Sequence, residues 1–213
     1  MSATEDLGLV QFVADDVTLE GTLRIPNDAR SVVVFAHGHG GDRRSPRSQY
    51  LAASLREMGF ATLLFNFLPA GEEPTEDTPD VAVLARRLVG ATDWIIKAAG
   101  ATNVRVGYFG AGTGAAAALI AATERTDVVQ AIVTRGAHAD LAKDAIPNVT
   151  APTLLIVGGL DTGVMDANRE ALRQLSCEKR FQIIPDAGHL FEEPGVLEQV
   201  SSVACQWYRR FLP

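Results

Sequence analysis

Apolar positions along this chain follow two patterns: short uninterrupted runs, and longer segments in which apolar residues recur with helical spacing. An uninterrupted run is expected for a strand buried on both faces of a parallel sheet, and helical spacing is typical of an amphipathic helix. Such runs predict strands at Ser31–Ala36, Ala61–Phe65 and Thr153–Val157, and strand-forming residues predict further strands at Val104–Phe109, Val129–Thr134 and Phe181–Ile184. The spaced segments predict helices at Arg47–Met58, Val81–Ala98, Ala115–Ala122, Asp166–Leu175 and Leu197–Phe211, with a short helix around Leu141–Ala145.

The order of these elements predicts an α/β fold. Two further strand-like runs, Leu9–Val13 and Val17–Arg24, suit an antiparallel hairpin at the edge of a sheet. The strands and helices that follow alternate regularly, which predicts a mostly parallel, doubly wound sheet of about seven or eight strands. No change in composition marks a second domain, so we expect one domain over residues 1–213. The connection from Thr134 to Thr153 is too short for a large lid.

Composition and charge narrow the range of partners. The 213 residues are 47% hydrophobic, which suits a globular domain with a sizeable core. The net charge of −7 and the pI of about 5.1 argue against nucleic acid or an anionic membrane as a partner. No apolar run approaches the roughly 20 residues that cross a bilayer, and the acidic N-terminus does not resemble a secretory signal. We therefore expect a cytoplasmic monomer or homodimer whose partner is a small molecule.

A glycine-rich turn joins the strand and the helix predicted within Val104–Leu119, with the sequence Gly110-Ala111-Gly112-Thr113-Gly114. A strand-to-helix turn this tight needs small flanking residues and an unusual backbone conformation at its tip. In the G-x-S-x-G elbow of α/β-hydrolases, the tip carries the nucleophilic hydroxyl. Here Gly110 and Gly114 occupy the flanking positions, and the tip is Gly112, which has no side chain. The segment predicts the frame of a nucleophile elbow without its nucleophile.

An acid and a base follow the elbow at the ends of two later strands. Asp161 comes after Thr153–Val157, and His189 comes after Phe181–Ile184. Each alone has a plain structural role, since an aspartate there can cap a helix and a histidine there can be a surface group. Together they follow the chain order of elbow, acid and base in α/β-hydrolase triads. We therefore interpret Asp161 as the residue that orients the imidazole and His189 as the general base.

A second glycine-rich loop, His37-Gly38-His39-Gly40-Gly41, follows the first buried strand. It is either a simple turn out of the sheet or half of an oxyanion hole, formed by the backbone N–H of His39 with that of Thr113. No Cys or carboxylate cluster completes a metal site with His37 and His39. The elbow glycines are not followed by the Lys-Ser or Lys-Thr of a phosphate-binding loop. We therefore expect neither a metal nor a cofactor.

Taken together, these features resemble the small, lidless α/β-hydrolases of the dienelactone hydrolase-like group. The shared motifs cover most of the chain from residue 31 onward and are His37-Gly38-x-Gly40, Ser45-Pro46-Arg47, Gly110-x-x-x-Gly114, Ala151-Pro152-Thr153, Gly159-x-Asp161 and Gly188-His189-Leu190-Phe191-Glu192-Glu193. The resemblance implies the α/β-hydrolase fold and a serine hydrolase of small esters or lactones. It also implies that Asp161 and His189 are the acid and the base, whereas the family's serine falls at Gly112.

The glycine at position 112 leaves three explanations open. The chain is an inactivated variant of an active enzyme, a natural relative that binds a small ligand without catalysis, or a hydrolase or lyase in which His189 activates a water. A shifted frame would make Thr113 the nucleophile, but a β-branched residue at a strained tip is disfavoured. The otherwise complete machinery favours the first explanation. Without its nucleophile, the chain should hydrolyse esters poorly.

Several residues near these loops are candidates for substrate contact. Phe67 and Leu68 follow the strand Ala61–Phe65 and either form an apolar wall or simply cover the sheet. Arg44 or Arg47 would bind a substrate carboxylate, as a dienelactone requires, or would carry surface charge or form a structural pair with a neighbouring acid. His37 is a further candidate, and His138 follows another strand end without a predicted role. We expect an open cleft for a small ester or lactone.

Overall fold

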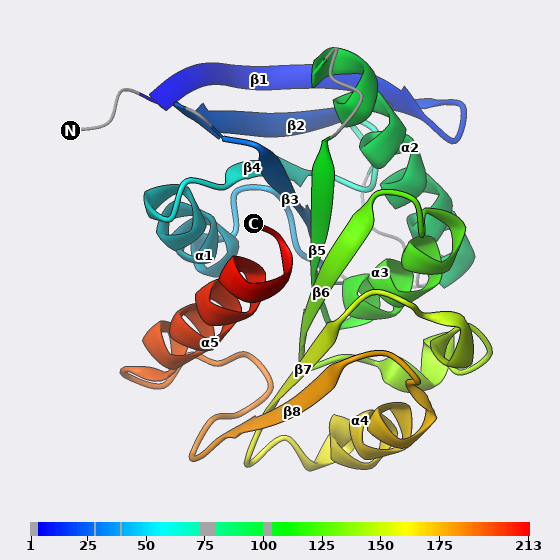
Figure 1. The fold of residues 1–213 in the computed structure, drawn as a ribbon, viewed down its shortest axis with the longest axis vertical. Coiled ribbons are helices and arrows are strands. Elements are labelled where there is room, and N and C mark those ends of the chain that lie inside the picture. The colour runs from blue at the N-terminus through cyan, green and yellow to red at the C-terminus, as the bar shows by residue number, and fades with distance from the viewer. Residues whose placement is uncertain (1–3, 28, 39, 73–79, 100–103) are drawn as a thin grey trace.

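The computed structural model describes residues 4–27, 29–38, 40–72, 80–99 and 104–213. Helices flank one eight-stranded sheet with the order β1-β2-β4-β3-β5-β6-β7-β8 (Figure 1). The strands are β1 (Thr4–Ala14), β2 (Val17–Pro26), β3 (Ser31–Ala36), β4 (Ala61–Phe65), β5 (Arg105–Ala111), β6 (Val129–Arg135), β7 (Thr153–Gly158) and β8 (Lys179–Ile184). The helices are α1 (Pro46–Glu57), α2 (Val81–Ala99), α3 (Thr113–Glu124), α4 (Thr162–Gln174) and α5 (Val196–Phe211), with 3₁₀ turns at Ala139–Ala142 and Ile146–Asn148.

The direction of the strands follows the hydrophobic pattern. Strand β2 pairs antiparallel with β1 and with β4, whereas each neighbouring pair from β4 to β8 is parallel. Strands β3, β4 and β7 are buried along their whole length, as their uninterrupted apolar sequences require. The prediction of a mostly parallel α/β-hydrolase sheet with an N-terminal antiparallel hairpin is confirmed.

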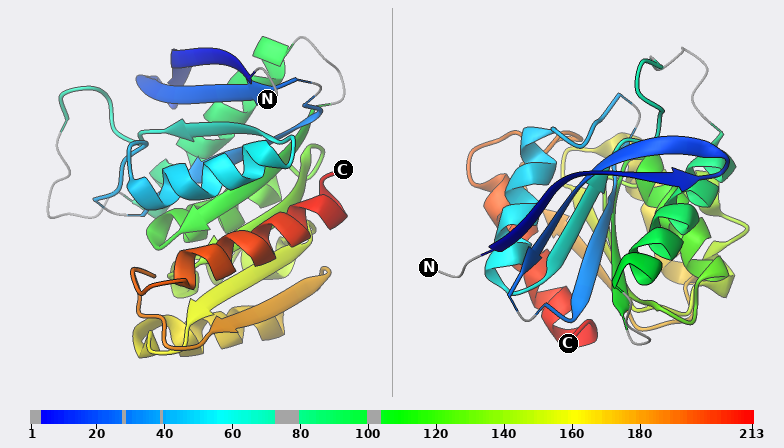
Figure 2. Two further views of the ribbon diagram at one scale, coloured as in Figure 1. Left: turned by 90° about the vertical axis from the view of Figure 1, so that its left-hand side faces the viewer. Right: turned by 90° about the horizontal axis from the view of Figure 1, so that it is seen from above.

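Helices cover both faces of the sheet. Helices α1 and α5 lie on one face, and α2, α3 and α4 lie on the other (Figures 1 and 2). Val33 and Phe35 of β3 belong to the buried cluster beneath α1 and α5, while Val32 and Val34 belong to the cluster beneath α2 and α3. Successive side chains of a strand point to opposite faces, so a strand covered on both faces is apolar at nearly every position, and Ser31 is the one polar residue of β3.

The alanine-rich helix α3 packs tightly against the sheet. Its residues Ala115–Ala118 are fully buried, and an all-apolar helix is expected in a core. The flanking glycines of the elbow are required by the same close packing. A Cβ on Gly114 would lie 2.3 Å from the carbonyl oxygen of Ala36, and a Cβ on Gly110 would lie 2.4 Å from Cα of Ala115. The small residues therefore bring the start of α3 against the end of β3.

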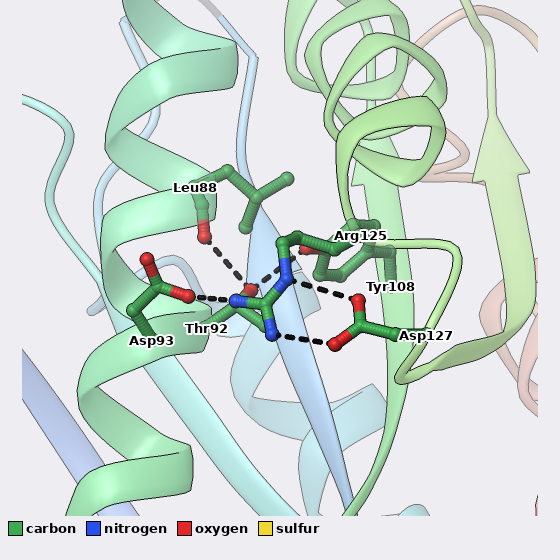
Figure 3. A network of polar contacts seen from close by, with 6 residues as sticks. All are labelled: Leu88, Thr92, Asp93, Tyr108, Arg125 and Asp127. Atoms are coloured by element: carbon green, nitrogen blue, oxygen red, sulfur yellow. Dashed lines mark hydrogen bonds and ion pairs between the residues drawn. The ribbon is translucent and has the colours of Figure 1, made fainter.

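A buried hydrogen-bond network joins the central strand β5 to α2 and α5. The hydroxyl of Tyr108 lies 2.7 Å from Oγ1 of Thr92, which donates to the carbonyl of Leu88 at 2.9 Å (Figure 3). Because the Thr92 proton is used in this way, Tyr108 is the donor to Thr92. From the other face of the sheet, the Tyr208 hydroxyl donates to the Tyr108 carbonyl at 2.6 Å. Burial raises the pKa of both tyrosines, which keeps them neutral donors.

An arginine at the end of α3 holds this helix in place. The Arg125 guanidinium donates to both carboxylate oxygens of Asp127 at 3.1 Å, and it pairs with Asp93 of α2 (Figure 3). Such a two-pronged contact fixes geometry as well as charge. The helix that begins at the elbow is therefore anchored at its far end to α2 and to the segment before β6.

Two helical predictions differ from the structure. Helix α4 begins at Thr162, four residues before the predicted start at Asp166, because Val164 and Met165 pack against Val157 and override the poor helix propensity of a glycine in this turn. The short helix predicted around Leu141–Ala145 is replaced by the two 3₁₀ turns. No inserted lid is present in the described ranges. Within those same ranges, no helix has both the length and the apolar character needed to cross a membrane.

Tyr108→Phe is expected to lower the free energy of unfolding by about 1 kcal/mol, because it removes a buried hydrogen bond while Thr92 keeps its bond to Leu88. Urea unfolding followed by circular dichroism measures the change. Tyr50→Phe is the matched control, since Tyr50 is exposed on α1. The network's contribution is contradicted if the two variants lose the same stability.

Candidate active site

Four strand ends and the start of α1 line a cavity of about 220 Å³. Functional loops of doubly wound sheets lie at the carboxyl ends of the strands, and the cavity lies at that edge. Its lining includes Gly38, Gly112, Thr113, Arg135, His138 and His189. The structure therefore brings the predicted elbow, the predicted base and part of the glycine-rich loop after β3 into one space.

Gly112 has a backbone conformation that residues with side chains rarely adopt, with φ of 55° and ψ of −122°. Its N–H donates to the carbonyl of Arg135 at 3.2 Å. Its carbonyl accepts from the N–H groups of Ala115 and His138, each at 3.2 Å. Two of these three partners belong to the end of β6 and the segment that follows it. The strained strand-to-helix turn is present, and a neighbouring strand end holds it.

The cavity has room for a small side chain at the tip of this turn. A Cβ on Gly112 would lie 3.6 Å from Cα of Gly38 and 4.0 Å from Cδ2 of His138, which are ordinary contact distances. Packing therefore does not force a glycine at this position. The positive φ angle is the main cost that a side chain would meet.

Asp161 and His189 form a direct pair. Oδ2 of Asp161 lies 2.7 Å from Nδ1 of His189. Asp161 is only 8% exposed and occupies the N-cap position of α4, yet its side chain makes no capping hydrogen bond. Since the carboxylate accepts the Nδ1 proton, Nε2 of His189 keeps the lone pair that can accept another proton. The His189 side chain is 44% exposed, so its ring is accessible from solvent.

A glycine that the sequence analysis did not single out makes room for this pair. Gly136 follows β6 with φ of 53°, and a Cβ there would lie 3.4 Å from two ring atoms of His189 and 3.6 Å from Oδ2 of Asp161. The sequence signal was a glycine directly after a buried strand, as at Gly38 and Gly110. Its role depends on a contact between β6 and a loop more than fifty residues later, which sequence spacing cannot show.

The loop that carries His189 is itself fixed by strain and hydrogen bonding. Asp186 and Phe191 have φ angles of 58° and 55°, which are uncommon for residues with side chains. Glu193 accepts a hydrogen bond from the Gly188 N–H at 2.9 Å, and this and other backbone hydrogen bonds lower the pKa of the Glu193 carboxyl. Strained backbone of this kind concentrates at functional sites. The loop therefore presents His189 in a defined position.

A second cavity, of about 350 Å³, is lined by the same loop after β3 as the first. Phe67 and Leu68 line it, as does Thr113. His37 lines both cavities, but its Nδ1–H donates to the Gly38 carbonyl at 2.9 Å, and its Nε2 accepts from the Phe67 N–H at 3.4 Å. Burial lowers the pKa of His37, which favours this neutral form. His37 therefore shapes the wall through its ring, while both ring nitrogens are engaged with the backbone.

Only some of the remaining predicted site residues line the cavities. Thr113 is the first residue of α3 and lines both cavities, whereas His39 lies outside the described residues. The predicted oxyanion hole is therefore described on its Thr113 side only. Arg44 is exposed and lines neither cavity, because it precedes α1 in a turn where its N–H donates to Asp42 at 2.8 Å. Of the two arginines considered, Arg47 is the one that lines the cavity with Gly112.

Two cavity residues had no predicted role. Arg135 ends β6, and the His138 ring centre lies 5.8 Å from that of His189. An arginine at the end of a mostly apolar strand was the available signal for Arg135. In the described part of the chain, no three His, Cys, Asp or Glu side chains are grouped so that they could hold a metal ion.

Comparison with known proteins points to one family. A family profile described as the Dienelactone hydrolase family matches residues 19–212. The crystal structure of a dienelactone hydrolase from Anabaena variabilis is 46% identical with a TM-score of 0.92, covering 99% of this chain and 98% of that chain. An α/β serine hydrolase without a lid from Xanthomonas campestris has a TM-score of 0.80 at 20% identity, over 97% of this chain and 95% of that chain. At that identity, the likeness concerns the fold alone.

A curated relative adds a different name. A putative phosphoribosyl transferase of Mycobacterium tuberculosis is 46% identical over 200 residues, which cover 93% of this chain and 45% of the relative. The chain thus spans less than half the length of that relative.

Gly136→Ala is expected to displace the His189 ring, because the added Cβ would come into van der Waals contact with the ring from a backbone strained by its φ of 53°. The measurement is the proton NMR signal of His189 Nδ1–H, which should shift or broaden. Gly59→Ala is the control, because Gly59 also has a positive φ, of 88°, but a Cβ there would meet nothing within 4 Å. Both variants carry about 1 kcal/mol of backbone strain. An unchanged His189 signal in Gly136→Ala would contradict the predicted displacement.

Proposed function

The chain belongs to the dienelactone hydrolase family, and we propose that its cavity is a site for hydrolysing small carboxylic esters or lactones that lacks a covalent nucleophile. The observation that carries this proposal is the 2.7 Å contact between Asp161 and His189 at the cavity that also contains the strained turn at Gly112. An oriented acid–base pair beside such a turn is the arrangement that nucleophilic acyl transfer requires.

The roles follow from what a hydroxyl at position 112 would do. His189 Nε2 would take the hydroxyl proton while the hydroxyl oxygen attacks the carbonyl carbon of the substrate. Asp161 would keep the imidazole in the required tautomer and stabilise the imidazolium. The backbone N–H groups of Thr113 and His39 would bind the oxyanion.

In the chain as it stands, a water above Gly112 takes the place of that hydroxyl. His189 accepts one proton of the water, and the water oxygen adds to the carbonyl carbon. The tetrahedral intermediate then expels the alkoxide, which receives the proton from His189, and the products are a carboxylic acid and an alcohol. Because a water is less well positioned than a side chain on a fixed backbone, this reaction is slow.

The two cavities offer places for the two sides of an ester. They share Thr113 and the loop after β3, so a carbonyl near Thr113 would have one substituent in each cavity. Phe67 and Leu68 give the larger cavity an apolar wall. The smaller cavity contains Arg47 and Arg135. We therefore infer a substrate that is apolar on one side of the carbonyl and polar or charged on the other.

The missing side chain also favours a second candidate, a protein that binds a small ester or lactone in the same cavities without hydrolysing it. The transferase name of the Mycobacterium tuberculosis relative refers to a protein of which this chain matches 45%. We do not carry that activity over, because the Asp161–His189 pair and the turn at Gly112 fit acyl transfer.

Gly112→Ser is expected to raise kcat/KM for p-nitrophenyl acetate on the order of a thousandfold, since it supplies the nucleophile to an oriented base. The same change should lower the free energy of unfolding by about 1 kcal/mol because of the positive φ angle. Steady-state kinetics and urea unfolding measure the two effects.

Two controls separate the predicted mechanism from a general effect of a new serine. Gly59→Ser places the same side chain at an exposed position with positive φ and should leave the rate unchanged. Adding His189→Ala to Gly112→Ser should lower the rate to that of the unaltered chain or below it, because the general base is gone. If Gly112→Ser is no more active than this double variant, the proposed hydrolytic site is wrong and the binding protein is favoured.

A further inference from the structure

Arg135 is buried at the cavity without an acidic partner in the described residues. It is 9% exposed and lines the cavity together with Gly112 and His189. Its Nη1 atom is buried and has no hydrogen-bond partner, and its guanidinium carbon lies 5.3 Å from the ring centre of Phe191. Burying a guanidinium nitrogen without a hydrogen-bond partner is unfavourable, and an aromatic face offsets only part of the lost hydration. The arrangement therefore fits a group that completes its hydrogen bonds with a ligand.

The positive charge of Arg47 acts on Arg135. Burial and the charge of Arg47 lower the pKa of Arg135 to about 10, so Arg135 stays charged at neutral pH while the two guanidinium groups repel each other. Arg47 lines the same cavity. An anion between the two side chains would turn this repulsion into two attractions.

The first turn of α1 adds hydrogen-bond donors to the same wall. Ser45, Arg47 and Ser48 all line the cavity. Ser45 is the N-cap residue, but its hydroxyl makes no capping hydrogen bond. A helix N-terminus carries a partial positive charge that favours an anion. The hydroxyls of Ser45 and Ser48 can each donate a hydrogen bond to an oxygen of such an anion.

We propose that this cavity contains a subsite for a phosphate group, held by Arg135, Arg47 and the first turn of α1. A phosphate monoester carries nearly two negative charges and three terminal oxygens, so it can accept from both guanidinium groups and from a serine hydroxyl at once. A carboxylate has one charge and two oxygens, which one arginine satisfies. The ligand class is therefore a small ester or lactone that carries a phosphate monoester. The phosphate serves recognition, and no bond to phosphorus forms or breaks.

The two arginines should contribute unequally. Arg47 also pairs with Glu192, and the two side chains are 32% and 60% exposed. A pair this exposed is weak, so a ligand can replace it, but part of the gain is lost in breaking it. Arg135 has no such partner to release and is the more buried of the two. Arg135 therefore dominates binding.

That the bound phosphate belongs to a substrate rests on the proposed function, whereas the binding itself needs no hydrolysis. Isothermal titration calorimetry of the unaltered chain at constant ionic strength uses three probes: phenyl phosphate, benzoate and inorganic phosphate. Phenyl phosphate should bind more tightly than benzoate, which tests phosphate against carboxylate. It should also bind more tightly than inorganic phosphate, which tests an organic phosphate against the free ion.

Arg135→Met should weaken phenyl phosphate binding by roughly ten- to a hundredfold, the range expected for lost hydrogen bonds to a charged group. Arg47→Met should weaken it by a smaller factor. Arg44→Met is the matched control, since Arg44 is exposed outside both cavities, and it should leave the affinity unchanged. Without ligand, Arg135→Met should have an equal or higher Tm, because the unpaired buried charge is gone.

Three results would overturn the phosphate subsite: unchanged phenyl phosphate affinity in Arg135→Met, tighter binding of benzoate, or tighter binding of inorganic phosphate. If Arg135→Met does not fold, Arg47→Met decides the question, and an affinity equal to that of Arg44→Met overturns the proposal. The subsite stands apart from the proposed hydrolysis. If phenyl phosphate binding depends on the arginines but Gly112→Ser is inactive, the proposed hydrolysis is wrong and the phosphate subsite stands. If Gly112→Ser is active but phenyl phosphate binding does not depend on the arginines, the phosphate subsite is wrong and the proposed hydrolysis stands.

Discussion

Three hydrogen bonds hold Gly112 in a backbone conformation that side chains disfavour, and the arrangement of the site depends on them. The Gly112 N–H donates to the Arg135 carbonyl, and the Gly112 carbonyl accepts from the N–H groups of Ala115 and His138. These bonds tie the start of α3 to the end of β6. The turn can therefore form only when β5 and β6 are in register. They also fix the backbone positions of Arg135 and His138. These three hydrogen bonds thus determine the positions of the elbow and of the Arg135 and His138 backbone at the same cavity.

The same constraint gives a physical meaning to the glycine at the tip. At φ of 55°, glycine is more stable than a residue with a side chain by about 1 kcal/mol. A nucleophile at this position therefore costs stability that the chain recovers when the nucleophile is absent. The Asp161–His189 pair, by contrast, has a geometry that folding alone does not require, since Asp161 gives up a helix cap to face the histidine. On the proposed function, the Asp161–His189 pair and the glycine tip form a site whose chemistry depends on one missing side chain.

Much of the fold could be predicted because the apolar sequence of a strand indicates by itself that the strand is buried. Uninterrupted apolar runs predicted β3, β4 and β7, and the Gly110–Gly114 turn predicted the elbow, since both are local properties. The site could be predicted only in part. The choice between Arg44 and Arg47 depends on where α1 starts, and the roles of Arg135 and Gly136 depend on contacts between distant loops. An unpaired buried charge is a tertiary property, because only the folded structure shows that no acid reaches Arg135 among the described residues.

Covalent labelling gives the most direct test of whether this chain is a hydrolase site that lacks one group. The measurement is intact-mass analysis of Gly112→Ser after treatment with an alkyl fluorophosphonate, with the unaltered chain and Gly112→Ser/His189→Ala treated in parallel. We expect one adduct on Gly112→Ser, mapped by peptide sequencing to the introduced serine, and no adduct on the other two proteins. No adduct on Gly112→Ser, or equal labelling in the absence of His189, would contradict this prediction.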